Sequence, residues 1–184
     1  MVDELDPVAS SSSSEEEEEE EDLKEDLYVR AERYKAKGNA CFKKGSEDRK
    51  AISWYSKALD LLLLEGDGAT GDLERSLLAA SYCNRAACFL RCGEWSAAVT
   101  DSDEVLRLCP PSSLTVKALF RRGKAHEALG DADAARRDFE SALMLEPQNK
   151  LATEAHDNYK SVLHRLVVLS RGAPEVRARQ RKGL

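Results

Sequence analysis

The sequence has few aromatic residues and no long apolar run. Aromatic side chains make up 6% of the 184 residues, whereas charged side chains make up 34%. This balance favours a helical protein with a large solvated surface over a β-sandwich. The run Leu61–Leu64 is only four leucines long, far short of the ~18 apolar residues that span a bilayer. We therefore expect no association with a membrane.

Paired cysteine motifs are also missing. The five cysteines are odd in number and include no Cys-x-x-Cys pair. We interpret them as small buried apolar residues in a reducing compartment. Cys88 and Cys92 lie one helical turn apart, and a metal shared with Cys83 or His126 is the alternative. No second ligand pair supports that alternative, so neither a metal nor a cofactor is expected.

Common catalytic motifs are absent as well. The sequence has no Gly-rich phosphate loop and no His-Glu-x-x-His zinc motif. Its three histidines, His126, His156 and His164, have no serine or cysteine partner in a catalytic pattern. We therefore predict that the chain is not an enzyme.

Charge is abundant, and it is concentrated at the two ends of the chain. Residues 1–26 contain thirteen acidic residues and one lysine. The last fourteen residues contain five basic residues and one acidic residue. The net charge of −6 therefore hides a nearly neutral central part. We divide the chain into an acidic tail at 1–24, a folded domain at 25–170 and a basic tail at 171–184.

The acidic tail is of low complexity, since Ser10–Ser14 is followed directly by Glu15–Glu21. We expect it to be disordered, because it repels itself and has almost nothing to bury. Ser12, Ser13 and Ser14 each have a glutamate three residues downstream, the pattern that an acid-directed kinase prefers. Phosphorylation would deepen the negative charge, and a purely solubilising tail is the alternative. Because the sequence is acidic from Asp3 onward, we expect no secretory or transit peptide.

From Asp26 onward, small and apolar residues repeat at fixed offsets. Small residues at an anchor and twelve positions later let two antiparallel helices approach closely, and a proline closes the second helix. Copy three, the most complete, is Gly123, Ala135, Phe139, Ala142 and Pro147. Copy two, at the same offsets, is Ala86, Ala98, Ser102, Val105 and Pro110. Copy one, longer by one residue, is Gly38, Ala51, Tyr55 and Ala58.

This spacing resembles the tetratricopeptide repeat, a helix–turn–helix unit of ~34 residues. The resemblance covers about residues 27–147 and implies an all-α, right-handed solenoid of three repeats. We expect helices at 25–44, 48–64, 73–92, 95–108, 114–129 and 132–145, and a capping helix at 148–170. Copies two and three are 37 residues apart, so extra residues are assigned to the turn at 110–113. The larger excess between copies one and two predicts a longer second helix, a loop and a lengthened first helix.

Polar and cationic residues fall on the first helix of each expected repeat. Lys35/Asn39 and Lys117/Arg121 are spaced i, i+4, which puts both members of each pair on one helix face. Asn84 lies between the two pairs. The strings Lys35-Ala-Lys-Gly-Asn39, Asn84-Arg-Ala-Ala and Lys117-Ala-Leu-Phe-Arg121-Arg resemble the two-carboxylate clamp of chaperone-binding tetratricopeptide domains. In such solenoids the first helices line the concave face, so the resemblance places all five residues in one groove.

The resemblance also implies the ligand and the partners. Equivalent residues grip the terminal carboxylate and the Asp side chain of Glu-Glu-Val-Asp tails, which end cytosolic heat-shock proteins 90 and 70. Two amides supply neutral hydrogen bonds, two lysines supply point charge, and Arg121 supplies a planar fork. Phe42 is expected to pack against the valine of the tail, and Arg91 to meet an upstream glutamate. The chain is then a cytoplasmic co-chaperone or adaptor.

Other interpretations remain open. Each cation alone is compatible with a solvated surface residue, and Asn84 is compatible with a bridge between helices. A scaffold that binds a non-chaperone protein through its convex face or tails is a second function. Nucleic-acid binding through residues 177–182 is a third, although no aromatic platform accompanies those arginines. The run Glu15–Asp22 is also a candidate competitor for the cationic groove.

Overall fold

The computed structural model describes residues 26–64, 71–108, 110, 112–148 and scattered residues of 150–160. The described residues form six helices: α2 (Leu27–Lys44), α3 (Asp48–Leu63), α4 (Asp72–Cys92), α5 (Trp95–Arg107), α6 (Ser112–Leu129) and α7 (Ala132–Leu145). No strand occurs in this part of the chain. Both tails, with Ser12, Ser13 and Ser14, lie outside the described residues, as does most of the expected capping helix.

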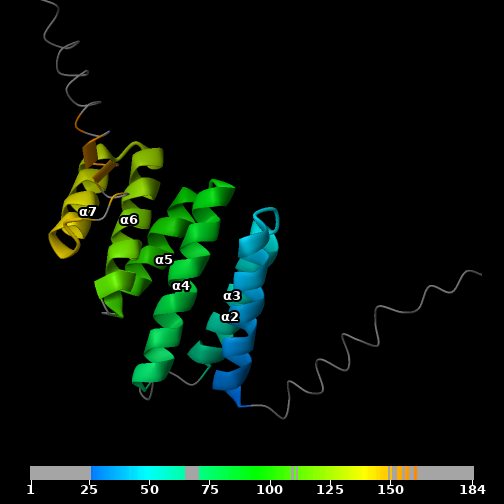
Figure 1. Ribbon diagram of the computed structural model, residues 1–184. Coiled ribbons are helices and arrows are strands. Elements are labelled where there is room, and N and C mark those ends of the chain that lie inside the picture. Colours follow the sequence, from blue (N-terminus) through cyan, green and yellow to red (C-terminus); the bar gives the residue numbers. More distant parts are fainter. Residues whose placement is uncertain are drawn as a thin grey trace, which may run out of the picture.

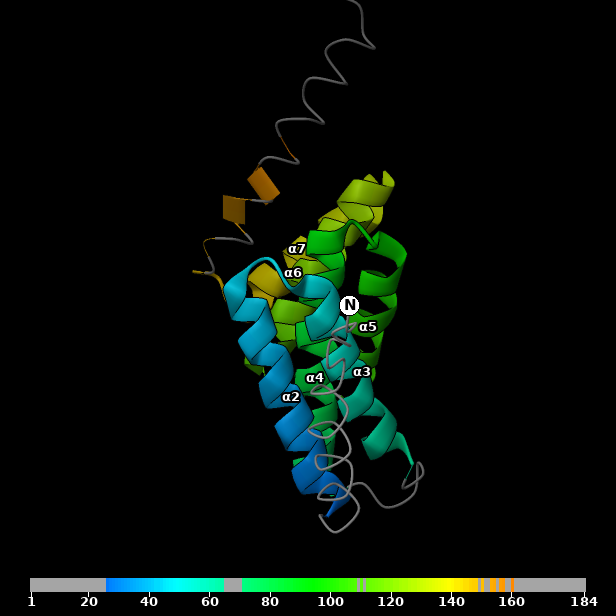
Figure 2. The same ribbon diagram turned by 90° about the vertical axis from the view of Figure 1, so that its right-hand side faces the viewer.

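The helices form three antiparallel pairs stacked in a row, α2–α3, α4–α5 and α6–α7 (Figure 1). We call these pairs repeats 1, 2 and 3. Each helix packs on the next, and α4 also contacts both α2 and α6. Among the described residues no comparable contact joins α3, α5 and α7. The first helices are therefore closer together than the second helices, which makes the first-helix side the concave side of the solenoid. Figure 2 views the stack from the α2–α3 end.

A glycine ends the first helix of every repeat. Gly45, Gly93 and Gly130 have φ of 77°, 76° and 83°, a left-handed conformation that other residues adopt only with strain. Each lies seven residues after its repeat anchor, and each N–H donates to a carbonyl of the last helical turn. The chain can then reverse within three residues and begin the second helix.

Contact between the anchor residue and the second helix sets the spacing within a repeat. A methyl group added to Gly38 would lie 2.6 Å from the Tyr55 ring, and one added to Gly123 would lie 2.6 Å from the Phe139 ring. Both rings are fully buried. In repeat 2 the anchor is Ala86, and the position of the ring is taken by the smaller, fully buried Ser102. The larger anchor residue on the first helix of repeat 2 is thus accommodated by a smaller residue on its second helix.

A row of polar contacts joins successive repeats. Arg85 holds Asp101 of its own repeat with two nitrogens at 2.8 Å and donates to Ser56 Oγ of repeat 1 at 2.8 Å. Arg122 repeats this pattern with Asp138 at 2.9 and 2.6 Å. It also reaches Asp103 of repeat 2 at 2.5 Å. Bidentate arginine–carboxylate pairs are directional, so these arginines fix the register of each repeat on the preceding one.

Repeat 1 carries a different pair at the position of these arginines. Lys37 takes the place of Arg85 and Arg122, and its Nζ lies 4.8 Å above the Trp54 ring. Lys57 Nζ lies at the same distance from that ring. A cation over an aromatic face thus replaces the ion pair at the end of the stack that faces away from repeat 2.

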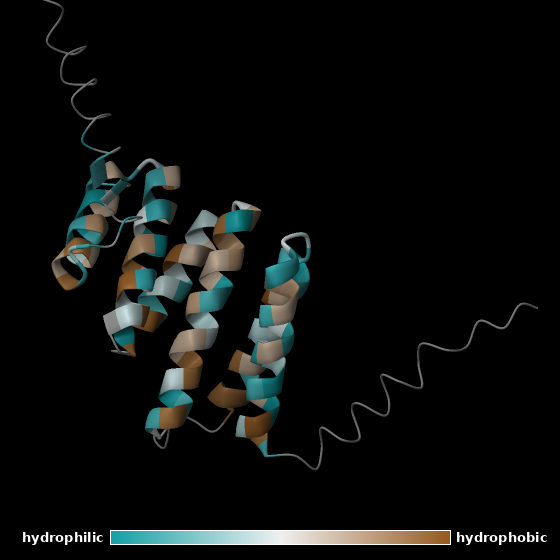
Figure 3. Ribbon diagram, in the orientation of Figure 1, coloured by the Kyte–Doolittle hydropathy of each residue, from teal (hydrophilic) through white to brown (hydrophobic). Residues whose placement is uncertain are grey.

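The six helices predicted between residues 25 and 145 are confirmed, with ends that differ by at most two residues; the capping helix predicted at 148–170 stays a prediction. α3 has 16 residues and α4 has 21, against 13 in α5 and 18 in α6, so the excess between copies one and two lies where it was expected. The turn predicted at 110–113 is shorter than expected, because Ser112 and Ser113 already belong to α6. Figure 3 shows apolar and polar residues alternating around each helix, as amphipathic packing requires.

The cysteines of the described part behave as small apolar residues. Cys41, Cys83 and Cys88 are buried and all four described cysteines are free. Burial raises the pKa of Cys88 to about 12, so this thiol stays protonated in neutral solution. No cluster of three potential metal ligands occurs among the described residues.

The anchor contact makes a testable prediction about stability. Alanine is the better helix former by about 1 kcal/mol, but Gly123→Ala pushes a methyl group into the Phe139 ring, and overpacking costs about 1–3 kcal/mol. After the gain in helix propensity is subtracted, we expect the free energy of unfolding in urea to fall by up to about 2 kcal/mol. The loss should shrink when Phe139→Leu is introduced first, because the ring is then gone. A stabilised Gly123→Ala variant would show that helix propensity outweighs the contact.

Candidate carboxylate-binding groove

The five predicted binding residues lie on the three first helices, as expected. Lys35 and Asn39 are on α2, Asn84 is on α4, and Lys117 and Arg121 are on α6. All lie on helices that form the concave side. Each of these five side chains is at least partly exposed, so each is accessible to a ligand.

The two asparagines contact each other across repeats 1 and 2. Asn84 Nδ2 donates to Asn39 Oδ1 at 3.0 Å, although the residues are 45 positions apart in the sequence. The Tyr55 hydroxyl of α3 donates to the same oxygen at 2.7 Å. The oxygen of Asn39 is therefore fully used, whereas no hydrogen bond of its NH₂ group occurs among the described residues. One N–H of Asn84 is also left for a ligand.

Arg121 brings repeat 3 to the same place. Its Nη1 donates to the carbonyl oxygen and the thiol of Cys83, the residue that precedes Asn84. Burial raises the pKa of the Cys83 thiol, and the positive charges of Arg121 and Lys117 oppose this rise. Arg121 also opposes the burial that raises the pKa of Tyr55. Lys117 and Arg121 of α6 thus act electrostatically on groups that lie next to the asparagine pair.

The two lysines are the uncommitted charges of the site. Neither Lys35 nor Lys117 forms a hydrogen bond or ion pair within the described part of the chain. Lys35 lies one turn before Asn39 on the same face of α2. Ammonium groups without an acidic partner offer their full charge to an anion. The structure therefore joins the two asparagines by a hydrogen bond and joins Arg121 to Cys83, the residue that precedes Asn84. Lys35 lies on α2 with Asn39, and Lys117 lies on α6 with Arg121.

Two further predicted contacts, Phe42 and Arg91, are already engaged with each other. The Arg91 guanidinium lies 4.4 Å above the Phe42 ring, and its Nη1 donates to the Phe42 carbonyl at 3.3 Å. Its Nε also pairs with Asp48 at 3.1 Å. Phe42 packs in addition against the core cluster of Cys41, Ala51, Tyr55 and Cys88. In this arrangement Arg91 ties α4 to the turn between α2 and α3.

Tyr55 was not among the predicted site residues. Its offset from Gly38 predicts only a role in repeat packing, which its ring fulfils beside Gly38. The signal was the hydroxyl itself, since the equivalent position of repeat 3 is Phe139, which fills the same space without one.

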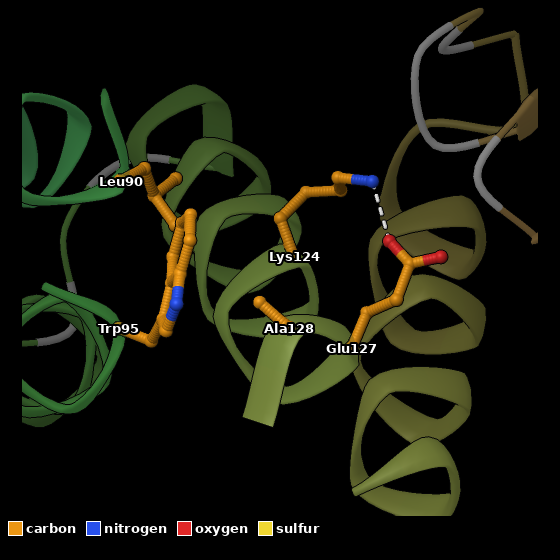
Figure 4. A pocket seen from close by; sticks show the side chains of 5 residues that line it. All are labelled: Leu90, Trp95, Lys124, Glu127 and Ala128. Atoms are coloured by element: carbon orange, nitrogen blue, oxygen red, sulfur yellow. Dashed lines mark hydrogen bonds and ion pairs between the residues drawn. The ribbon is translucent and has the colours of Figure 1, made fainter. Parts of the chain in front are cut away.

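A pocket of about 550 Å³ lies near the end of α6. Leu90, Trp95 and Ala128 supply its apolar wall, and Lys124 and Glu127, which also line it, form an ion pair (Figure 4). Arg121, Lys124 and Ala128 are spaced i, i+3, i+7, which puts them on one face of α6. The pocket thus shares a helix face with Arg121.

The chemistry of the groove is that of an anion receptor. The groups left for a ligand are amide N–H donors, two ammonium groups and the N–H groups of the Arg121 guanidinium that do not contact Cys83, and such donors form charge-assisted hydrogen bonds with carboxylates. None of the helices described here is long and apolar enough to cross a bilayer.

The comparisons with known proteins agree with the repeat geometry. A family model described as the tetratricopeptide repeat matches residues 116–149. The solved second TPR domain of human RPAP3, in complex with the HSP70 peptide SGPTIEEVD, is 31% identical with a TM-score of 0.59. The match covers 73% of this chain and 98% of that domain. The chain belongs to the tetratricopeptide-repeat family.

Two more similarities place this tetratricopeptide-repeat chain among its relatives. The first TPR domain of Spaghetti (RPAP3), bound to the HSP90 peptide SRMEEVD, is 30% identical with a TM-score of 0.61, over 74% of this chain and 95% of that one. Peptidyl-prolyl cis-trans isomerase FKBP4 of Bos taurus is 38% identical over 120 residues, which is 64% of this chain. The match spans 25% of that isomerase, so the chain spans about a quarter of the length of this relative.

The position of Arg91 gives a prediction that separates stability from binding. Arg91→Ala removes a stacked guanidinium, worth about 1 kcal/mol at a partly exposed site, and leaves Asp48 without its ion pair. We expect a loss of about 1–2 kcal/mol in the free energy of unfolding, measured by urea denaturation. Arg107→Ala, which removes an exposed i, i+3 pair with Glu104, is the control and should cost less than about 0.5 kcal/mol. Equal losses in both variants would contradict a structural role for Arg91.

Proposed function

We propose that the chain is a cytoplasmic co-chaperone or adaptor that binds acidic C-terminal tails of heat-shock proteins 90 and 70 through a carboxylate clamp. The observation that carries this proposal is the convergence of Asn39, Asn84 and Arg121 from three repeats. Two of its relatives are solved with such peptides, SGPTIEEVD and SRMEEVD, and both peptides end in Glu-Glu-Val-Asp.

The proposed clamp divides the two carboxylates of a C-terminal aspartate between its donors. The asparagine NH₂ groups and Lys35 receive one carboxylate, and Lys117 and Arg121 receive the other. Each charge-assisted hydrogen bond contributes about 1.5–3 kcal/mol. Once the ordering of the peptide is subtracted, an affinity in the micromolar range follows.

Residues upstream of the clamp give the ligand its remaining contacts. Phe42 supplies an apolar surface for the valine of the tail, and the pocket beside Trp95 accepts a further apolar side chain. Arg91 contacts an upstream glutamate only by giving up part of its pairing with Asp48. We therefore assign it a smaller share of the binding energy than Lys117 or Arg121.

We propose that the chain acts by binding and not by catalysis. The similarity to FKBP4 supports this, because it spans only 25% of that isomerase and coincides with the helical repeats of this chain. A scaffold for a non-chaperone partner is the alternative function. Such a scaffold would use the outer helices α3, α5 and α7 or the tails, and it would not need a free carboxylate on its ligand.

Calorimetry with tail peptides tests the proposal. The wild-type chain should bind SRMEEVD and SGPTIEEVD with micromolar dissociation constants, and each peptide with a C-terminal amide should bind at least about tenfold more weakly, since one charge-assisted contact is lost. Equal binding of acid and amide peptides would contradict the clamp.

Substitutions on α6 test which residues of the proposed clamp contribute to binding. Arg121→Ala and Lys117→Glu should weaken binding of the acid peptides by about 10–100-fold. Arg137→Ala, which removes an exposed cation of the outer helix α7, is the matched control and should bind as the wild type does. Binding that survives both α6 substitutions would favour the scaffold alternative.

A further inference from the structure

The Tyr55 hydroxyl is a buried polar group that serves the groove. The side chain is fully buried, and among the described residues its one hydrogen bond goes to Asn39 Oδ1 at 2.7 Å. Its ring is held by contact with Gly38, so the hydroxyl has little freedom to find another partner. Burial without this bond would cost about 1–3 kcal/mol.

The direction of this hydrogen bond decides what the asparagines offer to a ligand. An asparagine amide has one oxygen that accepts and one nitrogen that donates, and rotation by 180° exchanges them. Because the oxygen of Asn39 accepts from both Tyr55 and Asn84, its NH₂ group is left for the ligand. A rotated amide would present an oxygen instead, which repels a carboxylate and accepts from a carboxamide.

We propose that Tyr55 is the positioning residue that fixes the orientation of the Asn39 amide, and that it thereby makes the groove select a C-terminal carboxylate over a carboxamide. This inference rests on the proposed carboxylate-binding function. It adds to that function a reason for the selectivity: the hydroxyl of Tyr55 on α3, which holds a residue that contacts the ligand and does not contact the ligand itself.

The ionisation of Tyr55 is consistent with this role. Burial raises the pKa of its hydroxyl well above the ordinary value, and the positive charge of Arg121 only partly opposes the rise. The hydroxyl therefore keeps its proton throughout the neutral range, where it is always able to donate to Asn39.

The molecule itself contains the control for removing this hydroxyl. Phe139 occupies the equivalent position of repeat 3 and is equally buried, and a methyl group added to Gly123 would lie the same 2.6 Å from its ring. Tyr55→Phe would thus reproduce in repeat 1 a packing arrangement that repeat 3 already has. The substitution removes one hydrogen bond and leaves the ring in place.

Selectivity is the quantity to measure, because a loss of general stability does not change it. Calorimetry gives dissociation constants of SRMEEVD and its C-terminal amide for the wild type, Tyr55→Phe and Tyr82→Phe, with melting temperatures recorded for all three. Tyr82→Phe removes a hydroxyl from a half-buried tyrosine of α4 that forms no hydrogen bond with the asparagines. In Tyr55→Phe, we expect the ratio of amide to acid dissociation constants to fall at least about fivefold. The control should keep the wild-type ratio.

The same ratio of dissociation constants measured for Asn39→Asp is a second test, which does not depend on whether Tyr55→Phe folds. Its carboxylate still accepts from Tyr55 and Asn84 but has no N–H for the ligand, so the preference should invert toward the amide peptide. A wild-type ratio in a folded Tyr55→Phe, or a continued preference for the acid in Asn39→Asp, would overturn the inference alone. A wild-type chain that binds neither peptide, or binds both equally, would overturn the proposed function and the inference with it.

Discussion

Close approach of the first and second helix within each repeat is the constraint on which the structure depends. At Gly38 and Gly123 there is no room for a side-chain carbon beside the aromatic ring of the second helix. Each pair of helices is therefore locked at a fixed separation, and the arginines of repeats 2 and 3 then fix each pair on the one before. Convergence of the site follows: Asn39 and Asn84 meet at 3.0 Å because two repeats are stacked in one register.

Repeat packing and the proposed ligand binding use the same residues at one point. The Tyr55 ring belongs to the anchor contact, and its hydroxyl belongs to the groove. In a similar way Cys83 is a buried core residue whose carbonyl and thiol receive the guanidinium of Arg121. The binding face is thus a direct extension of the core, which favours a preorganised receptor whose donors need little rearrangement.

Much of this fold was predictable from the sequence, because the offsets between small residues, rings and prolines encode a helix pair. The same offsets revealed which helices carry the predicted clamp residues. Some features required the structure. The glycines at 45, 93 and 130 also repeat, yet only their backbone angles show that each ends a first helix. The exchange of an arginine–aspartate pair for Lys37 and Trp54 in repeat 1 preserves position but not residue type, so a search for identical residues overlooks it.

The site was predictable in its helix faces but not in its hydrogen bonds. Spacing of i, i+4 placed Lys35 with Asn39 and Lys117 with Arg121, because helix geometry fixes which residues share a face. Spacing carries no information on contacts between helices. It therefore could not show that Asn84 donates to Asn39, that Arg91 pairs with Asp48, or that Tyr55 supports the groove from behind.

The central claim is that donors from three repeats meet on one carboxylate-bearing ligand. The most direct measurement is a nuclear magnetic resonance titration of the ¹⁵N-labelled chain with SRMEEVD, following the side-chain amide signals of Asn39 and Asn84 and the Nε signal of Arg121. The account predicts that all three signals shift together, with one dissociation constant, while signals of the outer helices α3, α5 and α7 change little apart from those next to Tyr55. Shifts confined to the outer helices, or different dissociation constants for the asparagines and Arg121, would contradict it.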